Sequence, residues 1–219
     1  MKIERQSATI MDCYGESLTK ERGIAICKAL EEKGRICYKS LDKITEDSYI
    51  KFLSGIIKNG HTSVLEHCSL TAHIVTNKAI ETEIVRHRIA SYSISSTRYC
   101  NFSQDKFGNE ITFIEPCKSI ADNLGAFAKW KSSVEKAESS YLDLIELGYR
   151  PDHARGVLPL DVKSEINMTA NLREWRHFLS LRCSDRAHEQ IRAVAKMICK
   201  EFYNAMPVIF EDLYEQYCK

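Results

Sequence analysis

The chain has 219 residues and a nearly even balance of charge, with 31 lysines and arginines against 30 aspartates and glutamates. The formal net charge of +1 argues against the broad basic surface of nucleic-acid-binding proteins, so we expect no nucleic-acid partner. No stretch approaches the roughly 18 apolar residues that cross a bilayer, and no signal-peptide pattern opens the chain. We therefore expect a cytoplasmic protein that does not associate with membranes.

The first third of the chain predicts two helices and a strand. Apolar residues at a helical period predict a helix over 18–33 that ends at Gly34. A continuous apolar stripe predicts a second helix that begins near Thr45 and ends at Gly60. From Cys68 to Thr76, apolar and polar residues alternate, which is typical of a half-buried strand.

The rest of the chain continues this mixture of elements. Strands are expected over 111–114 and in the alternating segment around residues 162–168. Apolar periodicity predicts further helices over 78–88, 119–147, 171–182 and 187–203, with a brief helix at Pro151 and a break at Pro207. The helix over 119–147 has a longer apolar side than one core covers, which suggests a subunit interface. No linker or repeat interrupts the chain, so we expect a single domain over residues 1–219.

Nine cysteines are spread over the chain without a C-x-x-C pair. Their number is odd, and Cys27 and Cys199 occupy apolar helical positions, so we interpret them as reduced, mostly structural thiols. His61, His67 and His73 offer a possible zinc site, but no H-E-x-x-H motif accompanies them. We therefore expect no metal.

The stretch from Arg86 to Arg98, RHRIASYSISSTR, combines three arginines, a histidine and four serines. Guanidinium groups bind phosphate and carboxylate oxygens two at a time and stay charged at any working pH. Serine hydroxyls add hydrogen bonds without bulk. The stretch therefore indicates a site for a polyanionic, oxygen-rich small molecule, with a solvated basic face as the alternative.

This stretch also resembles the signature of flavin-dependent thymidylate synthases. The shared pattern is Arg-His-Arg, seven residues, Ser, one residue, Arg, which places Arg86, His87, Arg88, Ser96 and Arg98 at its fixed positions. Two further stretches resemble the same family. The segment over 61–67, HTSVLEH, precedes the predicted strand, and the segment over 155–182 runs from RGVLPL to NLREWRHFLSLR.

The resemblance implies an α/β (α+β) fold with a mixed, largely antiparallel sheet flanked by helices. It also implies a homotetramer that binds flavin and nucleotide between subunits. The implied reaction is the reductive methylation of dUMP to dTMP. In it, 5,10-methylenetetrahydrofolate donates the one-carbon unit, and FAD reduced by NADPH supplies the hydride.

Carried over position by position, the resemblance assigns two overlapping sets of residues. The FAD set is Ser63, Arg86, His87, Arg88, Asn171, Arg173 and His177. The dUMP set is Glu83, Arg86, Ser95, Ser96, Thr97, Arg98, Arg155 and Arg182. Arg182 is the expected catalytic residue, because a fixed cation at the uracil edge favours the N3-deprotonated ring and its electron-rich carbon.

Two residues depart from the family pattern. Ile94 stands where many members carry Glu or Gln, and Glu83 stands where some carry Gln. Two alternatives therefore remain open from the sequence: a flavin or nucleotide sensor without turnover, and a non-enzymatic RNA- or phosphate-binding module. Cys100 and Cys183 lie beside the motif stretches, but neither occupies a motif position, so we expect no enzyme nucleophile.

Overall fold

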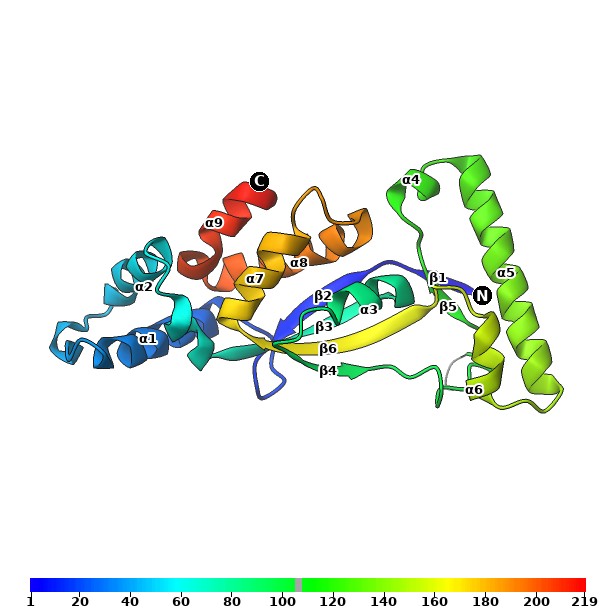
Figure 1. Ribbon diagram of the computed structural model, residues 1–219, viewed down its shortest axis with the longest axis horizontal. Helices are drawn as coiled ribbons and strands as arrows, with labels where there is room; N and C mark the ends of the chain where they lie inside the picture. The colour runs from blue at the N-terminus through cyan, green and yellow to red at the C-terminus, as the bar shows by residue number, and fades with distance from the viewer. Residues whose placement is uncertain (105–107) are drawn as a thin grey trace. The chain divides into compact units, whose positions relative to one another are not determined.

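The computed structural model describes residues 1–104 and 108–219, which divide into two compact units (Figure 1). Unit 1 consists of Met1–Ser7, Ile74–Arg86 and the described part of Ser93–Ile166. Unit 2 consists of Ala8–His73, His87–Tyr92 and Asn167–Lys219. The chain passes between the units several times, and two long strands contribute residues to both.

The architecture is mixed α/β, with an antiparallel sheet flanked by helices, as predicted. The strands are β1 (Lys2–Glu4), β2 (Ser7–Met11), β3 (Ser69–Asn77), β4 (Ser91–Ile94), β5 (Thr112–Ile114) and β6 (Lys163–Asn171). A four-stranded sheet has the order β2-β3-β6-β4, and β1 pairs with β5 in parallel. In β3 the residues Leu70, Ala72 and Ile74 are buried while their neighbours are more exposed, which confirms the predicted alternation.

Unit 1 contains β1, β5 and several helices (Figure 1). Its helical elements are α3 (Lys78–Ile84), α4 (Lys118–Ala121), α5 (Leu124–Glu146), α6 (Pro151–Ala154) and the 3-10 helix η4 (Arg155–Val157). Phe113 of β5 packs in one buried cluster with Val134 and Tyr141 of α5 and with Ala154 of α6. This cluster fixes the start of η4, where Arg155 lies.

Unit 2 is mainly helical. It contains α1 (Lys20–Ile36), α2 (Ser48–Lys58), α7 (Leu172–Arg182), α8 (Glu189–Ala205), α9 (Pro207–Tyr217) and the 3-10 helices η1 (Leu41–Lys43) and η2 (Thr62–His67). Trp175 of α7 packs against Phe178 and Phe202, and Phe202 stacks on Phe210 of α9. The indole N–H of Trp175 donates to the carbonyl of Leu70, 3.0 Å away, which fixes α7 on the sheet.

Several predicted boundaries were wrong. Gly34 lies inside α1 and does not end it. It allows close helix packing instead, because a Cβ there would come within 2.7 Å of the Phe52 ring of α2. Thr45 does not cap α2, which begins at Ser48 after Asp47. The predicted helix over 119–147 is two helices, because the Asn123 side chain caps the second by accepting from the Ala126 N–H.

Two further differences concern segments around the motif stretches. The helix expected over 78–88 ends at Ile84, and Ser91–Ile94 forms strand β4, for which no strand was predicted. After the predicted break, Pro207 opens the helix α9, a position where its missing N–H costs nothing. Within the described residues, no helix has the length and apolar character needed to cross a membrane.

Candidate functional site

The predicted site residues divide between the two units. Unit 2 holds Ser63, His87, Arg88, Asn171, Arg173, His177 and Arg182. Unit 1 holds Glu83, Arg86, Ser95, Ser96, Thr97, Arg98 and Arg155. The Arg-His-Arg stretch crosses a boundary between the units. Arg86 is the last residue of one segment of unit 1, and His87 and Arg88 begin a segment of unit 2.

In unit 2, the first turns of α7 line a pocket of about 480 Å³. Asn171 caps the helix, since its side-chain oxygen accepts from the Glu174 N–H at 2.9 Å. Arg173 and His177 lie four residues apart, both exposed, and line the pocket together with Asn171. Ile89 also lines it, with 69% of its surface exposed. The pocket therefore combines cationic and amide donors with an apolar surface, and the carboxylates of Glu66 and Glu174 also line it.

The remaining members of the predicted flavin set lie at other positions in unit 2. Ser63 is exposed on η2, in a 3-10 helix where a loop was expected. Arg88 is exposed after α3. Arg173 makes an ion pair with Glu66, Nη1 to Oε1 at 2.5 Å. Both partners are exposed, so the pair contributes little and can exchange for an anionic ligand.

His87 is buried, with 6% of its surface exposed. Its Nε2 lies 3.1 Å from Nε of Arg182, and its Nδ1 lies 3.3 Å from Oε1 of Glu174. A guanidinium can only donate, so Nε2 accepts, and the proton on Nδ1 is donated to the carboxylate. Burial, with the charges of Arg182 and His177, lowers the pKa of His87 below its usual 6.5, against the opposing effect of Glu174. The ring is therefore neutral at neutral pH and held in one tautomer.

We refer to Glu174, His87 and Arg182 as the α7 triad. Phe178 packs at the ring of His87 with centroids 4.8 Å apart. The Tyr92 hydroxyl donates to the His87 carbonyl at 2.6 Å, and burial raises the pKa of Tyr92 to about 12. These contacts restrain the histidine, so the triad fixes the Arg182 guanidinium at the end of α7.

Two members of the triad also belong to a possible ligand group for a metal. His87, Glu174 and His177 have ligand atoms within 4.8 Å of one another. Both ring nitrogens of His87 already have hydrogen-bond partners, Arg182 at one and Glu174 at the other. These hydrogen bonds account for the position of His87 and Glu174 in the group. The zinc alternative considered from the sequence involves other histidines, which form no such group in the described part of the chain.

In unit 1, the segment after β4 forms a loop that presents hydroxyl and guanidinium groups. The Ser96 hydroxyl accepts from the Arg98 backbone N–H at 3.2 Å. Arg155 Nη1 donates to the Thr97 hydroxyl at 3.4 Å, so η4 and this loop meet. Ser95, Ser96 and Thr97 line a cavity of about 680 Å³.

Three arginines of unit 1 make no ion pair with any acid of the described residues. Arg86, Arg98 and Arg155 are exposed, and none of them takes part in an ion pair within residues 1–104 and 108–219. Glu83, on α3, and Ile94, the last residue of β4, are half-buried. Uncompensated guanidinium groups beside hydroxyls suit a phosphate dianion.

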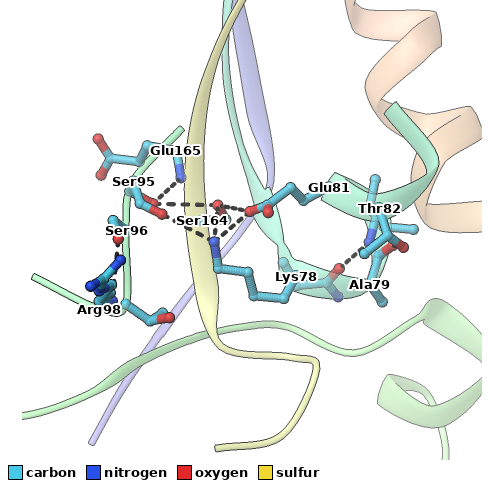
Figure 2. Close-up of polar contacts among 12 residues, drawn as sticks. Lys78, Ala79, Glu81, Thr82, Ser95, Ser96, Arg98, Ser164 and Glu165 are labelled. Atoms are coloured by element: carbon cyan, nitrogen blue, oxygen red, sulfur yellow. Dashed lines mark hydrogen bonds and ion pairs between the residues drawn. The ribbon is translucent and has the colours of Figure 1, made fainter. Parts of the chain in front are cut away.

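Sequence reasoning missed four residues that organise these sites. Glu174 is a buried acid on the otherwise apolar face of α7, and its position between Leu172 and Trp175 was the available signal. Lys78, Glu81 and Ser164 form a polar network with Ser95 (Figure 2). No spacing in the sequence brings Ser164 to α3.

Comparisons with known proteins agree with this pattern of residues. The family described as "Thymidylate synthase complementing protein" matches residues 26–208. The flavin-dependent thymidylate synthase of Geobacter sulfurreducens is 35% identical over 185 residues, which cover 81% of this chain and 78% of that one. The chain belongs to the flavin-dependent thymidylate synthase family.

Other members of the family and a solved structure extend the comparison. The flavin-dependent thymidylate synthase of Pyrococcus furiosus is 38% identical over 164 residues, 74% of this chain and 66% of that protein. The chain thus matches about two thirds of that relative's length. The crystal structure of the UMP/dUMP methylase PolB from Streptomyces cacaoi, bound with 5-Br dUMP, has a TM-score of 0.77. It is 22% identical and covers 99% of this chain and 98% of its own, which shows a shared fold.

Membership of the flavin-dependent thymidylate synthase family implies FAD as the cofactor, and the unit 2 residues fit such a group. Arg173 pairs with the exposed Glu66, and Arg88 of the Arg-His-Arg stretch is also exposed. A diphosphate needs cationic donors of this kind. The exposed Ile89 beside His177 offers a surface for a flat ring.

Proposed function

We propose that the protein converts dUMP to dTMP, with 5,10-methylenetetrahydrofolate as one-carbon donor, FAD as cofactor and NADPH as reductant. The observation that carries the proposal is the α7 triad, in which a buried, neutral histidine fixes the guanidinium of Arg182. An arginine fixed in this way can act on the electronic state of a substrate ring. A surface arginine that only attracts anions needs no such support.

The nucleotide phosphate is assigned to Arg86, Arg98 and Arg155. A phosphate dianion accepts several charge-assisted hydrogen bonds, each contributing about 1.5–3 kcal/mol net. Within residues 1–104 and 108–219, none of these guanidinium groups is paired with a carboxylate. The hydroxyls of Ser96 and Thr97 are placed beside them in the same loop, which supports a phosphate or sugar contact there.

Arg182 is assigned to the uracil ring. A fixed positive charge beside the ring favours the N3-deprotonated form, which moves electron density onto the carbon that is alkylated. His87 contributes by keeping the guanidinium oriented, and its neutral state avoids a second positive charge at that position. When bound, reduced FAD supplies the hydride. The residues assigned to holding it are Ser63, Arg86, Arg88, Asn171, Arg173 and His177. His87 was also expected there, but both of its ring nitrogens have protein partners, so its assigned role is to orient Arg182.

The assembly and location of the protein are also proposals. We propose a homotetramer of single-domain subunits, and the family match, which extends over segments of both units, supports the single domain. Leu124 at the start of α5 and Leu147 just after it are 88% and 75% exposed, which supports burial of this helix against another subunit. Cytoplasmic location stays a prediction from the sequence.

Two variants test the division of labour among the arginines. Arg182→Ala should lower kcat at saturating dUMP by far more than it weakens dUMP binding, because its role is assigned to the reacting ring. Arg155→Ala should instead raise the dissociation constant for dUMP, with little change in kcat. Steady-state kinetics and dUMP titration of both variants check this. Equal losses of dUMP affinity, with kcat unchanged in both, would contradict the assigned roles.

A further inference from the structure

Beneath the Ser95–Arg98 loop of unit 1 lies a network of charged and hydroxyl side chains from three segments (Figure 2). Lys78 Nζ lies 2.5 Å from Oε2 of Glu81, one turn along α3. The same ammonium lies 3.1 Å from the Ser164 hydroxyl of β6 and 3.1 Å from the Ser95 carbonyl oxygen. Lys78 and Glu81 are mostly buried, and Ser164 is completely buried.

The network uses the full donor capacity of the lysine. An ammonium has three N–H donors, and Lys78 has three acceptors within 3.1 Å. The Ser164 hydroxyl donates to the Glu81 carboxylate and accepts from Lys78. Every charge in the network is therefore paired and hydrogen-bonded, as a buried charge must be.

Ser95 is held by this network and by β6 at three of its atoms. Its backbone N–H donates to the Glu165 carbonyl at 2.9 Å, and its carbonyl accepts from Lys78. Its hydroxyl accepts from the Glu165 N–H at 3.0 Å and lies 3.3 Å from the Ser164 hydroxyl. Ser95 is thus engaged by the protein itself, while the loop that follows it leads through the half-buried Ser96 and Thr97 to the exposed Arg98.

We propose that Lys78, together with Glu81 and Ser164, is a positioning residue for nucleotide binding, and that Ser95 is the anchor through which it acts. The network fixes the start of the loop at Ser95. The next residues of the loop, Ser96 to Arg98, bind the phosphate. This inference rests on the proposed function, because it assigns the loop to dUMP. It changes the role of Ser95 from a ligand of the substrate to the fixed point of the loop.

The chemistry of the network favours positioning over stability alone. A buried lysine–glutamate pair is a weak contributor to stability, and apolar side chains of similar size often replace it without loss. Such side chains would fill the space between α3 and β6, but they could not hold the Ser95 carbonyl. Stability and anchoring can therefore be separated by experiment.

The test uses the full-length flavin-loaded protein and three variants. Lys78→Met removes the ammonium, and the double variant Lys78→Met with Glu81→Leu also removes the carboxylate that the first change leaves unpaired. Lys118→Met is the matched control, because Lys118 is an exposed lysine of unit 1 whose ion pair is with the exposed Asp122, four residues along the chain. Thermal unfolding, flavin absorbance, kcat at saturating dUMP and the dissociation constant for dUMP are measured for each.

We expect the double variant to recover most of the Tm that Lys78→Met loses, because no unpaired buried charge remains. Both variants should still bind dUMP at least about tenfold more weakly than the unaltered protein, since a loop displaced by about 1 Å loses binding geometry. Flavin content and kcat should be retained, and Lys118→Met should match the unaltered protein. Should the Lys78 variants not fold, Ser164→Ala is expected to weaken dUMP binding in the same direction with the charged pair kept.

The outcomes separate this inference from the function on which it rests. A double variant, or Ser164→Ala, that binds dUMP as tightly as the unaltered protein would overturn the positioning role alone. Failure of the unaltered, flavin-loaded protein to bind dUMP would overturn both. If Lys78→Met binds dUMP weakly and the double variant regains both Tm and dUMP affinity, the network serves stability only.

Discussion

Replacing Glu174 tests whether the α7 triad orients Arg182. Glu174→Ala removes the acceptor of the His87 Nδ1–H while leaving all groups assigned to contact substrate in place. The histidine can then adopt the other tautomer, with the proton on Nε2, where it faces the Nε–H of Arg182 and the hydrogen bond between them is lost. The expected consequence is a mobile guanidinium and a lower kcat.

The size of the effect follows from the bonds involved. A hydrogen bond to a charged group contributes about 1.5–3 kcal/mol, and the 3.3 Å separation of Nδ1 and Oε1 favours the lower end. At about 1.4 kcal/mol per tenfold in rate, Glu174→Ala should lower kcat by about 10- to 100-fold. Glu174→Gln is the matched control, because its amide oxygen still accepts from Nδ1–H, and it should stay within about threefold of the unaltered protein.

The pH dependence of kcat gives an independent measurement of the triad. Protonation of Nε2 of His87 removes the acceptor for Arg182, so activity should fall as pH drops through the His87 pKa, which lies below 6.5. Glu174 opposes that lowering, while burial, Arg182 and His177 promote it. Glu174→Gln should therefore move the acid limb to still lower pH. Wild-type kcat in Glu174→Ala, with an unchanged pH profile, would refute the orienting role.

Three further changes test other parts of the structure. Arg176→Met removes a bidentate ion pair to Asp212 on α9. It should lower the free energy of unfolding, measured by urea denaturation, by about 1–3 kcal/mol, and the folded fraction should still bind flavin. Gly34→Ala should cost about 1–3 kcal/mol in the same assay, because its Cβ would meet the ring on α2; an unchanged midpoint would contradict the close contact. Cys100→Ala and Cys183→Ala should keep turnover within about tenfold, since neither thiol is assigned to attack the ring; a folded, ligand-binding but inactive variant would refute that mechanism.

Much of the fold was predictable because its signals are local. The apolar periods of α2, α7 and α8 and the alternation in β3 depend only on neighbouring residues. Strand β4 was missed because its pairing depends on β6, about 70 residues away in the chain. Directly after β4, the Ser95 N–H likewise donates to the Glu165 carbonyl of β6. Gly34 was misassigned for the same reason, since its partner is a ring on another helix.

The candidate site shows the same limit. The arginines and serines of the motif could be named from their spacing, because the family pattern is a pattern in sequence. The residues that support the motif could not be identified, because they are distant in sequence from their partners. Glu174 is 87 residues from His87, and Ser164 is 86 residues from Lys78. The pattern therefore identified the residues assigned to ligands, and the structure identified the residues that orient them.

One measurement tests the central claim most directly. The purified protein, loaded with FAD, is incubated with dUMP, 5,10-methylenetetrahydrofolate and NADPH, and dTMP is quantified against reactions that lack each component. The account predicts dTMP formation that requires all of them and that falls sharply in Arg182→Ala. Bound flavin and dUMP without product would favour the sensor, and no binding of either, with affinity for RNA instead, would favour the binding module; both results would contradict the proposed function.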